Sequence, residues 1–360
     1  MIQSNRLVFI VILAAALGPV FSLTAHGQAV TTERELSEPG VWTVTDEPLP
    51  GSAERMLARA RQSLAAGRYR DARAQADAFI DRYPDHTLTP EAYLLRGEAL
   101  YYQREYYKAL YDYEYVARVY PGSEAFLRAL EREYEIAVMF ARGVKRKIWG
   151  LRWGSAYSEA EELLIRIQER TPGSQLAERA GRALAELYYR RRDMESATIA
   201  YDLFLQNHPE ASDLPDAMRR LIYAHLATYR GPRFDPSGLY EARSWLERME
   251  VRYPAEAQAM GSEGLRRRID ESDAEQMYAQ VSWYLRRNDP VSALFVMKRL
   301  IRVYPDTVAA GLAYDQMVER GWLEVDEIDP PVTADTAAAT DDERSAEESA
   351  EEAARATTDG

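Results

Sequence analysis

The sequence predicts an all-α protein, a right-handed α-solenoid of about six helical hairpins with a C-terminal capping helix. Three observations predict this fold: a proline that recurs along the chain, an alanine at a fixed distance before each proline, and amphipathic stretches between the two. The recurring prolines are Pro84, Pro121, Pro172, Pro209, Pro254 and Pro305. Amphipathic stretches with apolar residues at helical spacing indicate helices that pack on one side.

An alanine lies twelve residues before each of these prolines. The six alanines are Ala72, Ala109, Ala160, Ala197, Ala242 and Ala293. A small residue is needed where the two helices of a hairpin cross closely. Proline ends the second helix, because it lacks an N–H group and clashes with the preceding turn. Each alanine–proline pair therefore predicts the second helix of one hairpin.

The prolines recur at intervals of 37 to 51 residues. The shorter interval is close to the ~34 residues of a tetratricopeptide repeat, and the longer ones predict insertions at residues 144–154, at residues 230–238 and after Pro254. We expect the solenoid to span residues 53–321, with units that end near residues 84, 121, 172, 209, 254 and 305. A helix at about 307–321 would cap its exposed apolar face. No alternating runs that would predict strands stand out.

The two ends lie outside the predicted solenoid. Residues 1–29 combine Arg6, an apolar run over 7–17 and small residues at Gly27 and Ala29, the pattern of a secretory signal. An uncleaved membrane anchor is the alternative for this segment. Residues 30–52 predict an extended leader, and residues 322–360 predict a disordered acidic tail. From Glu324 onward this tail holds 13 acidic and two basic residues and no aromatic residue.

Composition excludes several classes of function. The formal charge is −13, and such an acidic balance argues against nucleic-acid binding, which needs clustered basic residues. Most of this negative charge lies in the tail, so the solenoid itself is close to neutral. The absence of cysteine excludes disulfides, a cysteine nucleophile and a thiolate metal site.

No catalytic motif of a serine hydrolase, a nucleotide-binding loop or a zinc protease is present. We therefore expect no enzyme activity, no cofactor and no metal. Carboxylates such as Glu131, Glu133, Glu161 and Glu162 are interpreted as solvated helix faces with arginine partners. A glycosidase pair, and hence an unrecognised hydrolase, is the least favoured alternative.

The first helices of the hairpins carry rows of aromatic and arginine residues. The candidate groove residues are Tyr93, Arg96, Tyr101, Tyr188, Arg191 and Trp283. These residue types dominate the energetics of protein–protein interfaces. A concave surface that presents them could bind an extended peptide or a partner helix. We expect more than half of the tyrosines to fill seams between helices instead.

The insertion at residues 144–154 alternates basic and aromatic residues. Its candidate binding residues are Lys145, Arg146, Lys147, Trp149, Arg152 and Trp153. Three interpretations are open. The segment folds back on the solenoid with both tryptophans buried, or it docks an acidic partner such as the chain's own tail, or it contacts an anionic membrane surface as a peripheral element.

The export signal and the units that end in Tyr-Pro resemble the BamD, or YfiO, family of outer-membrane protein assembly factors. The closest part is residues 277–307, with a Tyr-rich helix, a basic turn, an Ala-led helix and a final Tyr-Pro-Asp-Thr. The resemblance implies a non-catalytic periplasmic scaffold, peripheral to the outer membrane, that binds envelope proteins such as a β-barrel assembly complex.

The chain departs from that family in one respect. Family members typically carry a lipidated cysteine after the signal, and none of the 360 residues is a cysteine. Other periplasmic tetratricopeptide proteins look similar as well. An adaptor like the coordinator of the Tol-Pal system, or one for polysaccharide export, is therefore the alternative function.

Overall fold

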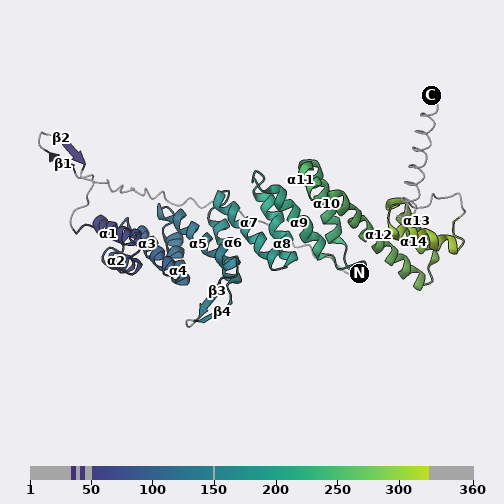
Figure 1. Ribbon diagram of the computed structural model, residues 1–360, viewed down its shortest axis with the longest axis horizontal. Coiled ribbons are helices and arrows are strands. Elements are labelled where there is room, and N and C mark those ends of the chain that lie inside the picture. The colour runs from purple at the N-terminus through teal and green to yellow at the C-terminus, as the bar shows by residue number, and fades with distance from the viewer. Residues whose placement is uncertain (1–33, 38–40, 45–50, 149–150, 324–360) are drawn as a thin grey trace, which may run out of the picture.

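The computed structural model describes residues 34–37, 41–44, 51–148 and 151–323. Within these ranges the chain is a row of helices stacked along one long axis (Figure 1). Each helix packs against the helix that precedes it in sequence and the one that follows, so the predicted helical solenoid is confirmed. The predicted signal over residues 1–29 and the acidic tail from residue 324 lie outside the described residues.

Six helical hairpins form the solenoid. They are α1–α2 (Ala53–Ala65, Tyr69–Arg82), α3–α4 (Thr89–Tyr102, Tyr106–Val119), α5–α6 (Ala125–Ala141, Tyr157–Arg170), α7–α8 (Gln175–Arg190, Met194–Asn207), α9–α10 (Leu214–Thr228, Ser237–Arg252) and α12–α13 (Ser262–Arg286, Pro290–Val303). A short helix α11 (Pro254–Ala259) precedes the last hairpin, and α14 (Val308–Glu319) follows it. We call the first helix of each hairpin and α14 the A helices, and the second helix of each hairpin a B helix.

The alanine–proline pattern has the structural role that the sequence predicts. All six alanines are fully buried, with an exposed fraction of 0%. Each B helix ends two residues before its proline. The residue before the proline leaves the helical region, as Tyr83 does with φ −132° and ψ 61°, because the proline ring disfavours a helical conformation there. The pattern therefore sets both the crossing point and the end of each B helix.

The turn between the two helices of every hairpin contains a residue with positive φ. These residues are Gly67, Arg104, Gly143, Arg192, Gly231 and Asn288. A left-handed residue lets the backbone reverse while the last carbonyls of the A helix stay bonded. The N–H of Asp193, for example, donates to the carbonyl of Tyr188 at 3.1 Å.

Two β-hairpins differ from the expectation that no strands would form. Strand β1 (Arg34–Ser37) pairs antiparallel with β2 (Val41–Val44), within the segment predicted as an extended leader. Strand β3 (Lys145–Ile148) pairs antiparallel with β4 (Leu151–Ser155), between α5 and α6. In both cases the sequence between the strands is two or three residues long and includes a glycine, a residue type that short hairpin connections favour. The strands are too short for alternation to reveal them.

The long helix α12 divides the hydrophobic core near the C-terminal end. Its first half packs with α9, α10 and α11 around Ile269, and its second half packs with α13 and α14 around Val281 and Met297. The expected insertion after Pro254 is thus a helical extension that links two parts of the core. Helix α14 closes the second part, as the sequence predicts for a capping helix.

No helix in the described ranges has the length and apolar character needed to cross a bilayer.

The close crossing at the alanines predicts different effects for two neighbouring substitutions in α2. Ala72→Leu should lower the free energy of unfolding by about 1–3 kcal/mol, because the buried crossing has no room for the added atoms. Ala74→Leu is the matched control, since Ala74 is exposed on the same helix, and it should change this free energy by less than about 0.5 kcal/mol. Urea unfolding followed by circular dichroism measures both, and equal effects would contradict the close crossing.

Candidate partner-binding surface

Ion pairs join neighbouring A helices along the solenoid. Between α3 and α5, the Nε atom of Arg132 lies 2.7 Å from Glu98, whose side chain is almost completely buried. Between α7 and α9, Arg220 lies 2.7 Å from Glu186. Glu91 of α3 accepts contacts from both sides, from Arg61 of α1 and from Arg128 of α5. These pairs use much of the charge on the A helices to hold repeats together.

Arg96 is one of the candidate groove residues, and it ties its A helix to two B helices. Its guanidinium donates two hydrogen bonds to the buried Asp112 of α4, at 2.9 and 2.6 Å, and one to Asp77 of α2 at 2.9 Å. These bonds raise the pKa of Arg96 further. The guanidinium also lies 4.9 Å from the ring centre of Tyr93, which is 4.4 Å from that of Tyr115. The structure therefore places Arg96 and Tyr93 in a seam between helices.

Three more candidate residues also contact neighbouring elements. The ring of Tyr101 packs against Tyr102 and Tyr106. The hydroxyl of Tyr188 donates to Glu161 at 2.8 Å. The guanidinium of Arg191 lies 5.2 Å from the ring centre of Tyr157. These contacts anchor one helix on the next.

Trp283 of α12 differs from the other aromatic candidates. Its side chain is 43% exposed, and the guanidinium of Arg287 lies 4.1 Å from its ring centre. Among the six candidate groove residues, Trp283 is thus the aromatic side chain that keeps a large accessible face. Trp149, a candidate in the insertion, lies outside the described residues, and the other five insertion candidates are described there only as backbone.

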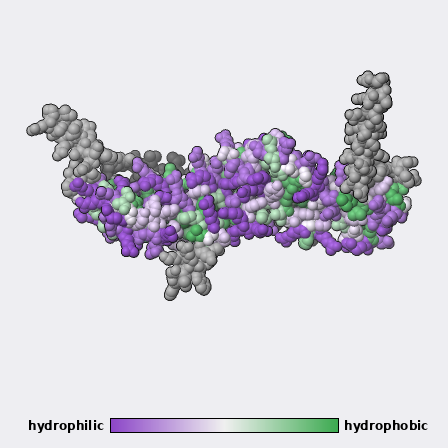
Figure 2. All heavy atoms as spheres, in the orientation of Figure 1, coloured by the Kyte–Doolittle hydropathy of each residue, from purple (hydrophilic) through white to green (hydrophobic). Residues whose placement is uncertain are grey.

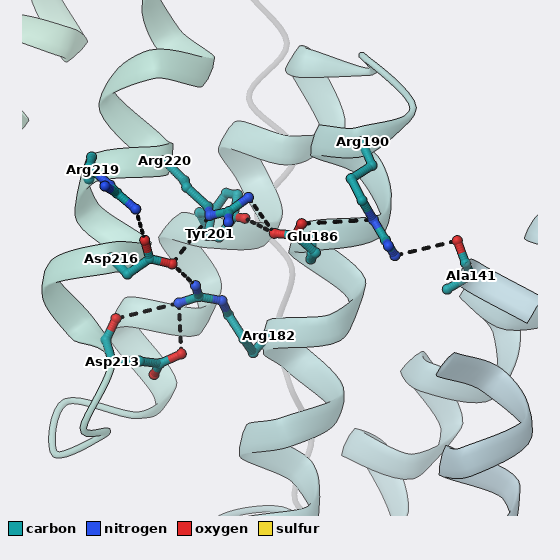
Figure 3. Close-up of polar contacts among 9 residues, drawn as sticks. All are labelled: Ala141, Arg182, Glu186, Arg190, Tyr201, Asp213, Asp216, Arg219 and Arg220. Carbon is teal, nitrogen blue, oxygen red and sulfur yellow. Dashed lines mark hydrogen bonds and ion pairs between the residues drawn. The ribbon is translucent and has the colours of Figure 1, made fainter. Parts of the chain in front are cut away.

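A polar network at the centre of the solenoid joins α7, α8 and α9 (Figure 3). Glu186 accepts hydrogen bonds from the Tyr201 hydroxyl at 3.1 Å and from Arg220. Asp216 accepts from Arg182, Arg219 and Arg220. Burial opposes ionisation of Asp216, but the charge of Arg182 and its neighbours lowers the pKa of this carboxyl overall. A carboxylate paired in this way stabilises the contact between helices. It is a poor general acid, because its lowered pKa keeps it ionised.

Glu133 of α5 corrects one interpretation of the sequence. It was interpreted as part of a solvated face, but its side chain is completely buried. Its expected arginine partner is present, because Arg170 of α6 lies 3.5 Å from Oε2. The face of α5 that carries Glu133 packs against α6, so the carboxyl leaves water when the hairpin closes. Burial raises the pKa of Glu133 to about 8, although the charge of Arg170 opposes the shift.

A groove of about 950 Å³ lies between α12, α14 and the loop that follows α9. We call it the C-terminal groove. Its lining includes apolar Tyr278, Trp283 and Leu312 and charged Arg233, Glu275 and Arg286. Figure 2 shows several apolar patches on a largely hydrophilic body, one of them near the C-terminal helices. An open, partly apolar groove with a few charges suits a segment of another protein.

Glu271 sets the position of α14 beside the groove. Its carboxylate accepts the N–H groups of Val308 and Ala309 at 2.9 and 3.2 Å, at the start of α14. Glu271 and Leu312 are not among the candidate residues that the sequence predicts. Neither has a local signal, because α12 and α14 meet only in the folded chain.

No group of histidine and carboxylate residues in the described ranges is arranged to hold a metal ion.

A family model described as YfiO, outer membrane lipoprotein, matches residues 152–322. The match begins in β4 and continues past the end of α14, so it includes both the central polar network and the C-terminal groove. It confirms the family resemblance that residues 277–307 indicate. No curated protein matches the chain.

The seam around Arg96 predicts a specific pattern of stability. Arg96→Met should lower the free energy of unfolding by about 3 kcal/mol, because Asp112 is left buried without its counter-charge. Adding Asp112→Leu should recover most of that loss, since both charges are then gone. Urea midpoints of the two single variants and the double variant measure the coupling. Losses that simply add in the double variant would contradict this role for Arg96.

The buried Glu133 predicts a stability that depends on pH. The raised pKa means that the folded chain keeps this proton up to about pH 8, whereas the unfolded chain releases it near the ordinary value of 4.5. Between these pH values the unfolded state binds fewer protons, so the contribution of Glu133 to stability falls as pH rises. Glu133→Gln removes this dependence. Its free energy of unfolding relative to the wild type should therefore rise between about pH 5 and about pH 9. A difference that stays constant across this range would show that Glu133 is not buried as a neutral acid.

Proposed function

We propose that this chain is a non-catalytic scaffold of the cell envelope, which holds segments of partner proteins on its A-helix surface during outer-membrane protein assembly. One observation carries the proposal. The helices that form the C-terminal groove lie within the region that matches the outer membrane lipoprotein family model. The link to outer-membrane protein assembly comes from the sequence resemblance, which implies that function for the family.

The C-terminal groove has the composition of a protein-binding site. Trp283 and Leu312 line it and are 43% and 49% exposed. Large apolar side chains at the centre of an interface contribute most of its binding energy, and polar groups around them fix orientation. Arg286 and Glu275 supply such groups on the same helix as Trp283. Several charged residues of the other repeats form ion pairs between helices, as Arg132 does with Glu98 and Arg220 does with Glu186.

The rigidity of the solenoid supports the same function. A scaffold must present its surface without rearrangement, since ordering a surface on binding costs affinity. Arg182, Arg220 and Glu186 join adjacent repeats, and Glu271 joins α12 to α14. The groove is therefore formed before a partner arrives.

Affinity purification from the envelope of the producing cell tests this function. The full chain should recover an outer-membrane β-barrel insertase, identified by mass spectrometry. Trp283→Ala combined with Leu312→Ala should lower this recovery about tenfold or more, because it removes the apolar centre of the groove. Ile199→Ala is the matched control, since Ile199 is an apolar residue of α8 that is 64% exposed.

The outcomes separate the function from the site. Recovery of no envelope protein contradicts the scaffold. Recovery of the insertase at equal levels with the wild type and the groove variant keeps the scaffold but excludes the C-terminal groove as the docking site.

A further inference from the structure

One side of α13, near the C-terminal end of the solenoid (Figure 1), is exposed and carries both apolar and basic residues. Val291 and Phe295 lie about one turn apart and are 77% and 69% exposed. Arg299 and Arg302 follow on the same side, since residues three and four apart share a helix face, and both are exposed. We call these four residues the outer face of α13. The opposite side of the helix is buried against α12 and α14.

The outer face of α13 differs in charge from the rest of the solenoid. Each of the other five B helices contains at least two acidic residues, whereas α13 contains none. Asp289 precedes α13 and caps it, because its carboxylate accepts the N–H of Ser292 at 3.0 Å. In the described part of the chain, neither Arg299 nor Arg302 forms an ion pair. The face therefore presents unpaired positive charge beside exposed apolar side chains.

The segment that follows α14 begins close to this face. A turn of four residues joins α13 to α14, and the two helices pack together. Helices joined by so short a turn are antiparallel, so α14 ends near the start of α13. Trp322 and Leu323 pack against the same hydrophobic cluster as Val296 and Met297 of α13. The next residues along the chain therefore start about one helix diameter, on the order of 10 Å, from the outer face.

The sequence of this segment is complementary to the outer face. Residues 324–332 contain four acidic residues, no basic residue and the apolar residues Val325, Ile328 and Val332. The face is ~17 Å long from Val291 to Arg302, at 1.5 Å per helical residue. Nine extended residues reach up to ~30 Å, which is enough to cross one helix and follow the face to its end.

We propose that residues 324–332 dock on the outer face of α13 of the same chain. Their apolar residues cover Val291 and Phe295, and their carboxylates pair with Arg299 and Arg302. Tethering selects this occupant over a free acidic peptide, because a short linker gives the segment an effective concentration in the millimolar range.

This contact goes beyond the scaffold function and uses a different surface. None of the four residues of the outer face lines the C-terminal groove. Docking of the segment and binding of a partner in the groove can therefore fail independently of each other.

Double electron–electron resonance on the full chain tests the proposal. The sequence contains no cysteine, so spin labels attach only at Glu247→Cys, an exposed position of α10, and at Thr333→Cys, just after the segment. A docked segment should give a narrow distance distribution. An undocked link of ten flexible residues from Leu323 to the label would spread that distribution over roughly 17 Å.

Charge reversal on either side of the contact should release the segment. Arg299→Glu with Arg302→Glu should broaden the distribution, and so should Asp326→Lys with Asp329→Lys, because like charges then face each other. Combining all four substitutions should restore the narrow distribution. The matched control is Arg267→Glu with Arg268→Glu, with the same change in net charge on exposed positions of α12, and it should leave the distribution narrow.

The apolar half of the contact has its own variant. Val291→Ser with Phe295→Ser leaves the net charge unchanged and should also broaden the distribution, since it removes the apolar side chains that the segment covers. Raising the ionic strength to about 1 M, where the screening length is about 3 Å, should weaken the charged half. The Asp326→Lys and Asp329→Lys variant changes no residue of the solenoid, so its effect cannot come from a misfolded α13.

Four results would overturn the proposal. They are a broad distribution in the wild type, a narrow one that survives both charge reversals, no recovery when the reversals are combined, and equal broadening by the α12 control. Mixing chains that carry only one label each identifies the remaining occupant. A dipolar signal in that mixture would show that the segment docks on a second copy of the chain, and its absence is expected for docking within one chain.

Discussion

The close crossing of two helices at a buried alanine is the constraint on which the rest of the structure depends. In each of the six hairpins this alanine has no exposed surface, so the helix axes can approach until backbone and small side chains touch. The proline twelve residues later ends the B helix at the same distance from every crossing. The repeats then stack, and each buries the apolar face that its neighbour cannot cover alone.

The charged residues of this solenoid stabilise contacts between helices. Arginines such as Arg96 and Arg132 bond to carboxylates that are buried between helices, and an unpaired charge in such a place would be costly. The charged and aromatic rows of the A helices therefore hold the repeats in register. The C-terminal groove lies where the long helix α12 interrupts the regular stacking, and it keeps Trp283 and Leu312 exposed.

Residue types alone do not distinguish the residues that bind partners from those that pack between helices. Tyrosine, arginine and tryptophan at helical spacing predict a binding row, yet Tyr93, Arg96 and Tyr188 contact neighbouring helices, and Trp283 keeps an accessible ring. The same residue types serve interhelical seams and interfaces, because both are partly apolar surfaces with polar edges. The same holds for carboxylates. Glu133 is buried only because α5 packs on α6, which its residue type does not predict.

The sequence by itself determined the number of hairpins, the ends of the B helices, the capping helix and the basic character of the insertion. These follow from local physics: proline ends a helix, alanine permits close approach, and apolar periodicity defines a helix face. Only the tertiary structure decided that the insertion is a projecting hairpin, that α12 divides the core, and that Glu271 and Leu312 flank a groove with Trp283. These features depend on contacts between residues that are distant in sequence, and such contacts exist only once the repeats have stacked.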